Sequence, residues 1–138
     1  MASVEDNLWP VDQLQLDAVT PLTLVKSQAA QLGKMTGGVL NAEVVTSETE
    51  DGRIEHAIDV VAPALDYRHR ILTVQHDKDV VYPVAIWDIY GKGFPIIPSQ
   101  LQVIRIMQNM LADDHVVAVL NSLIARINES ASQSSDSQ

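Results

Sequence analysis

Cysteine is absent from this chain of 138 residues. A disulfide framework, a thiolate nucleophile and every cysteine-ligated zinc or iron–sulfur site are therefore excluded. The absence is typical of a protein from a reducing compartment, so we expect a cytoplasmic location.

Membrane-directing segments are also missing from the sequence. Residues 1–7 contain acidic but no basic residues, and no apolar run of the signal-peptide type follows them. The longest apolar segment, Val80 to Ile89, is interrupted by Pro83 and Asp88. It falls short of the roughly 18 apolar residues of a membrane span. We expect neither secretion by that route nor a transmembrane helix.

Positive charge is scarce. Nine Lys and Arg residues against eighteen Asp and Glu residues give a formal net charge of −9. Binding to nucleic acid requires Lys and Arg to displace counterions from phosphates, so nucleic acid and anionic membranes are poor partners. A partner protein with a basic surface would be attracted by the same field, although acidity also simply keeps a protein soluble.

Catalytic signatures are absent as well. No serine lies in a Gly-x-Ser-x-Gly turn, and the segment Gly91–Gly93 lacks the remaining residues of a phosphate-binding loop. Glu55 and Asp59 share one face of a predicted strand, where we expect them to be solvated. The spacing of the residues neither shows nor excludes a Ser–His–acid triad, because the three residues can be far apart in sequence and meet only in the folded chain. We predict no catalytic residue, no metal site and no cofactor.

The length and composition of the chain indicate one domain with an arm and a tail. Its 46% of apolar residues is sufficient for a core. Residues 1–19 form an apolar N-terminal arm, which we expect to dock on the core through Trp9. Residues 20–129 form the domain. Residues 130–138, mostly Ser and Gln, are expected to be disordered.

Helical patterns flank a block of strand patterns. Thr20 as the cap and Pro21 as the first residue predict a helix from Pro21 to about Thr36. Two further helices are predicted, from about Ser99 to Leu111 and from Asp113 or Asp114 to about Asn128. The apolar stripe of the first helix includes Met35 and that of the second includes Ile104, so we expect these two side chains to face the core.

Four strands are predicted between the helices: Val39–Val45, Arg53–Val61, Arg70–His76 and Val80–Tyr90. Asp51 and Gly52 form the turn between the first two. Pro83 cannot donate a hydrogen bond to a ladder, so it belongs at an edge or at a bulge, and a meander with the fourth strand at one edge satisfies this most simply. The fold class is therefore α+β, a four-stranded antiparallel meander with one helix before it and two helices after it packed on one face.

Aromatic residues are few, and most lie around the third and fourth predicted strands beside two arginines. This group consists of Tyr67, Arg68, Arg70, Tyr82, Trp87 and Tyr90. Tyr, Trp and Arg dominate the hot spots of protein interfaces. Rings beside basic residues also bind single-stranded nucleic acid, but the net charge opposes that use. We predict that the group forms a partner-binding surface.

The histidines suggest a different site. Alternation along the strands predicts that His56 and His76 can face each other on neighbouring strands, with Asp59 or Asp77 nearby. Carboxylate and imidazole together can hold zinc, but the spacing matches no recognised ligand pair. His56, Asp59 and His76 are candidates for lining a ligand pocket between sheet and helices.

Two functions are compatible with these features. The leading hypothesis is a noncatalytic protein-binding module, and self-association through a sheet edge or helix face would make it a homodimer. In size and charge alone the chain is similar to small acidic proteins that bind another protein, such as immunity proteins, adaptors and secretion chaperones. The alternative is a small-ligand binder or modest hydrolase that uses the pocket at His56, Asp59 and His76.

Overall fold

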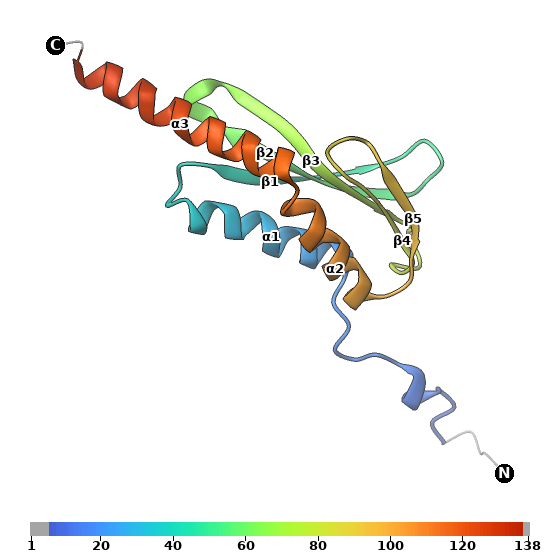
Figure 1. The fold of residues 1–138 in the computed structure, drawn as a ribbon. Coiled ribbons are helices and arrows are strands. Elements are labelled where there is room, and N and C mark those ends of the chain that lie inside the picture. Colours follow the sequence, from blue (N-terminus) through green and yellow to red (C-terminus); the bar gives the residue numbers. More distant parts are fainter. Residues whose placement is uncertain (1–5, 137–138) are drawn as a thin grey trace.

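The computed structural model has one antiparallel sheet with three α-helices packed against it (Figure 1). It describes residues 6–136, and the side chains of residues 6–132. The strands follow one another in the order β1-β2-β3-β4-β5, and each pairs antiparallel with the next. The α+β class and the antiparallel meander predicted from the sequence are confirmed. Within the described residues, no helix is long and apolar enough to cross a membrane.

The sheet has five strands, so the predicted count of four is wrong. The bounds are β1 Asn41–Glu48, β2 Ile54–Ala62, β3 Tyr67–His76, β4 Val84–Trp87 and β5 Gly93–Ile97. The extra strand, β5, lies in a segment rich in Gly and Pro in which no strand was predicted. An edge strand needs hydrogen bonds on one side only, which explains why β5 tolerates Pro95.

The fourth strand is shorter and more central than predicted. β4 pairs with β3 on one side and with β5 on the other, so it is not an edge. Pro83 lies immediately before β4 and outside its ladder. The proline therefore sets where β4 begins, and places no constraint on the position of β4 in the sheet.

The helices begin where their caps predict. α1, Pro21–Met35, is capped by the Oγ1 atom of Thr20, which accepts a hydrogen bond of 3.2 Å from the backbone of Thr23. α2, Gln100–Leu111, starts after Ser99 in the same way. α3, Asp114–Asp136, continues through most of the segment expected to be a disordered tail. Each residue added to an existing helix gains a hydrogen bond, which favours this extension.

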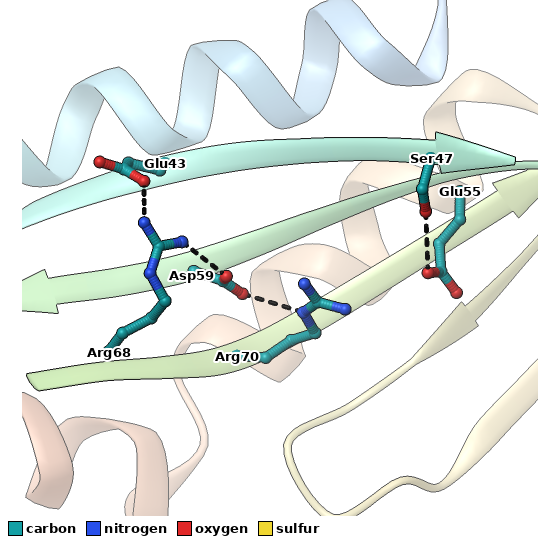
Figure 2. A network of polar contacts seen from close by, with 6 residues as sticks. All are labelled: Glu43, Ser47, Glu55, Asp59, Arg68 and Arg70. Atoms are coloured by element: carbon teal, nitrogen blue, oxygen red, sulfur yellow. Dashed lines mark hydrogen bonds and ion pairs between the residues drawn. The ribbon is translucent and has the colours of Figure 1, made fainter.

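The sheet has one apolar face and one polar face. Along β2, the side chains of Ile58 and Val60 point towards the helices and are buried. They pack with Val74 of β3, Val25 of α1 and Val103 of α2 in one core. The opposite face carries charged and polar side chains and is not covered by the helices (Figure 2). We call it the open face.

The N-terminal arm does not dock on the core. It contains a short 3-10 helix, η1 Val11–Gln13, with no buried residue, and it leads away from the domain (Figure 1). The side chain expected to anchor it, Trp9, is 75% exposed. The prediction of docking is therefore wrong, because apolar character alone does not provide a complementary surface.

Candidate functional site

Two histidines meet in the interior. His56 of β2 and His76 of β3 are both buried, and their Nε2 atoms are 2.9 Å apart. The Nδ1 atom of His76 is 2.7 Å from the carbonyl oxygen of Asp77, and the Nδ1 atom of His56 is 2.9 Å from the Oγ1 atom of Thr46. The sequence-based prediction that the two histidines face each other is confirmed.

Hydrogen-bond chemistry determines the direction of this chain of contacts. A carbonyl oxygen only accepts, so Nδ1 of His76 must carry a hydrogen and donate it. In neutral His76, Nε2 then accepts from the Nε2–H of His56, and Nδ1 of His56 accepts from the hydroxyl of Thr46. All four ring nitrogens have partners. Burial lowers the pKa of His56, and the nearby His76 and Lys26 lower it further.

Asp59 lies on the other side of the sheet from this pair. Three positions separate His56 from Asp59 along β2, so their side chains point to opposite faces. The structure thus brings together two of the three residues predicted to line a ligand pocket. The hydrolase form of that hypothesis needs an imidazole and a carboxylate in one cavity, which these residues do not provide. In the described part of the chain, no group of three or more His, Asp or Glu side chains is arranged to hold a metal ion.

On the open face, Asp59 is the centre of an ion-pair network (Figure 2). Its carboxylate accepts hydrogen bonds of 2.9 Å from Nη1 of Arg68 and from Nε of Arg70. Arg68 also pairs with Glu43. Burial alone would raise the pKa of Asp59, but the hydrogen bonds from the two arginines outweigh it and hold the pKa below its usual value. Both arginines are thereby held in position along β3.

The group of residues predicted to bind a partner is distributed over the molecule. Arg68, Arg70 and Trp87 lie on the open face of the sheet, as their register positions show. Tyr67 pairs with Ala62 and so lies on the helix-facing side. Three of the six residues, Arg68, Arg70 and Trp87, therefore share one surface, and the three tyrosines lie outside it.

The two remaining tyrosines lie at separate ends of the fold. The hydroxyl of Tyr82 donates to the carbonyl oxygen of Val19 at 2.8 Å, where the arm joins the domain. Tyr90, which is exposed, donates to Asp113 at 2.7 Å and stacks on the ring of His115. Tyr82 therefore supports the arm, whereas Tyr90 joins the turn after β4 to the start of α3.

The structure shows an apolar groove that the sequence analysis missed. A cavity of about 510 Å³ lies between α1 and α2, and a second of about 210 Å³ lies between α1, α3 and the sheet. Gln28 and Leu111 line both cavities, so the two are neighbours, and together we call them the α1/α2 groove. Met35 and Ile104 line it while remaining 73% and 41% exposed.

The groove left only an ambiguous signal in the sequence. Met35 and Ile104 lie on helical stripes that the sequence analysis expects to face the core, and a stripe does not show whether its rim is covered. A comparison of the chain with protein-family models, curated proteins and solved structures finds no match. The function must therefore be argued from the groove and its surroundings.

Proposed function

We propose that this chain is a noncatalytic protein-binding module that receives an apolar segment of a partner polypeptide in the α1/α2 groove. The observation that carries the proposal is the exposed apolar lining of the groove. An apolar surface that remains exposed in a folded chain marks a site of interaction. Methionines such as Met35 and Met107 adapt their shape to different apolar side chains.

The polar groups of the groove suit recognition of a peptide. Gln28 and Gln108 line it, and each amide can donate to and accept from the backbone of a bound segment. No titratable side chain is among the residues that line the two cavities. The histidine pair and Asp59 already have partners elsewhere. This distribution supports binding rather than chemistry.

The electrostatic field supports a partner that is basic around its apolar segment. The net charge of −9 would accelerate association with such a partner at low salt. Apolar contacts in the groove would then supply the affinity, since their contribution depends little on salt.

The experiment is site-directed photo-crosslinking, for which the lack of native cysteine is an advantage. A benzophenone attached at Gln108→Cys, in the groove, should capture a polypeptide from cell lysate. The same probe at Ser47→Cys, on the open face, is the matched control and should not capture it. Mass spectrometry identifies the captured polypeptide.

Calorimetry with the purified partner then tests the mode of binding. We expect a negative heat-capacity change, which marks burial of apolar surface, and a loss of affinity of at least tenfold for Ile104→Asp. Equal capture from both probe positions, or unchanged affinity of Ile104→Asp, would remove the proposal.

A small apolar ligand is the second candidate, because the smaller cavity lies between helices and sheet. Its lining includes Ile58 and Ile71 of the sheet and Leu120 of α3. A melting-temperature screen with short fatty acids and other apolar metabolites separates the two functions. A rise in melting temperature that Ile71→Phe abolishes favours the small ligand. If no compound raises the melting temperature, the partner protein is favoured.

A further inference from the structure

The N-terminal arm, residues 7–18, exposes large apolar side chains to solvent. They are Leu8, Trp9, Val11, Leu14 and Leu16, and each is at least half exposed. Leu16 reaches 91%. Exposure of so many apolar residues on a short segment is characteristic of a surface that binds another surface.

The root of the arm is held in a fixed position. The backbone N–H of Val19 donates to Oε1 of Gln100 at 3.1 Å, and its carbonyl oxygen accepts from Tyr82. Both backbone groups of Val19 are thus engaged beside the first turns of α1 and α2. From this point the arm runs away from its own helices (Figure 1). To reach its own groove, the chain would have to reverse direction within the few residues next to Val19.

One charged side chain beside the groove can pair with the arm. The arm carries Asp12 and Asp17 and no basic residue. On α2, Arg105 follows the groove residue Ile104 and is exposed. Arg105 takes part in none of the ion pairs found among the described residues. Asp12 or Asp17 of an arm can therefore pair with Arg105 beside the groove, and this contact acts against the repulsion between two chains that each carry a net charge of −9.

We propose that the arm of one copy binds in the α1/α2 groove of a second copy, and that the two copies exchange arms reciprocally. The inference rests on the proposed function, since the same groove is used. In a dimer with two-fold symmetry, each arm fills the groove of the other copy, so no arm and no groove is left uncovered. The arm then competes with the partner polypeptide, so partner binding depends on release of the arm.

The first test is the mass of the full chain in solution, measured by light scattering after size exclusion. We expect about twice 15.1 kDa for the natural chain. Leu14→Asp/Leu16→Asp in the arm, and Ile104→Asp in the groove, should both be monomeric. Gln13→Asp/Gln15→Asp adds the same charge at polar positions of the arm and should remain dimeric. A monomeric natural chain overturns the inference.

The second test shows which groove the arm occupies. One copy carries a spin label at Gln13→Cys and no ¹⁵N, and it is mixed with a second copy that contains ¹⁵N and no spin label. In this mixture the amide signals of Gln108 and Leu111 should broaden. In the control, the spin label and ¹⁵N are on the same copy, which is diluted into excess protein that carries neither. In this sample the two amide signals should not broaden. Broadening only in the diluted sample means that the arm folds back on its own groove, which overturns the exchange. Absence of broadening in both samples overturns it as well.

The variants separate this inference from the proposed function. If the arms do not exchange but the probe at Gln108→Cys still captures a partner, the inference fails and the function stands. If the arms exchange but Leu14→Asp/Leu16→Asp, with its groove free, binds no partner, the proposed function fails. If the arms exchange and the groove also binds a partner, Leu14→Asp/Leu16→Asp should bind that partner at least several-fold more tightly than the natural chain does.

Discussion

The Nε2 atoms of His56 and His76 lie 2.9 Å apart with one hydrogen between them. A second proton on this pair would place an uncompensated charge in the interior. Lys26 opposes that charge, and the carboxylate of Asp77 already lies 3.6 Å from Arg53. The pair is therefore stable in its neutral form, and the fold should respond to acid in the range where histidine titrates.

The first prediction concerns this pH dependence. The pKa of His56 is lower in the folded chain than the value of 6.5 expected when unfolded. The unfolded state then binds more protons below that pH, so stability should fall as the pH drops through and below it. Urea unfolding at about pH 7.5 and about pH 5.5 measures the slope, which for one proton is at most about 1.4 kcal/mol per pH unit.

Substitution should remove that slope. His56→Gln should make the free energy of unfolding less dependent on pH, whereas His115→Gln, at an exposed position, should leave the slope as it is. An unchanged slope in His56→Gln would show that other groups cause the acid response.

The second prediction concerns Asp59. Asp59→Asn keeps the shape of the side chain but removes the charge that Arg68 and Arg70 share, and should lower the free energy of unfolding by about 1–3 kcal/mol at neutral pH. Glu43→Gln, at a half-exposed position, should cause a smaller loss. Because the pKa of Asp59 is lowered in the folded state, its contribution is present above about pH 4 and lost as the pH falls further. Equal stability of Asp59→Asn and the natural chain would contradict the network.

The third prediction tests the contact between β4 and β5. A Cβ atom at Gly93 would lie 2.7 Å from Nε1 of Trp87, so Gly93→Ala must displace the indole. We expect a loss of about 1–3 kcal/mol. In a Trp9→Phe background, the fluorescence of Trp87 reports the displacement directly. An unchanged emission spectrum and unchanged stability would show that β5 does not pack as described.

The fourth prediction concerns the root of the arm. Tyr82→Phe removes the donor to the carbonyl oxygen of Val19 and keeps the ring. The loss in stability should be about 0.5–1.5 kcal/mol, and ¹⁵N relaxation should show faster motion of residues 17–19. Thr23→Val, at the first turn of α1, serves as a control that leaves this hydrogen bond intact. Rigid residues 17–19 in Tyr82→Phe would mean that Gln100 holds the root alone.

Local chemistry explains the parts of the fold that the sequence predicted. Thr20 and Pro21 mark the start of α1 because one accepts a hydrogen bond from the first turn and the other lacks an N–H that would be unpaired there. The contact between His56 and His76 follows from alternation on two paired strands. Each of these features depends on residues close in sequence or on one strand register.

The parts that were missed depend on residues far apart in sequence. β5 exists because β4 offers it a ladder, which no local pattern near Pro95 indicates. Asp59 was expected to be solvated, yet two arginines from the next strand cover it. Propensity and periodicity describe one segment at a time, and so do not show what another segment places opposite it.

The sequence by itself determined the α+β class, the order of the three helices and of the first four strands, and the alternation that pairs His56 with His76. Only the tertiary structure decided which apolar side chains find a partner. Val25 and Val103 are enclosed, whereas Ile104 and Leu16 remain exposed, although all four side chains are apolar. The physical reason is that burial is a property of two surfaces in contact, and a sequence pattern describes only one of them.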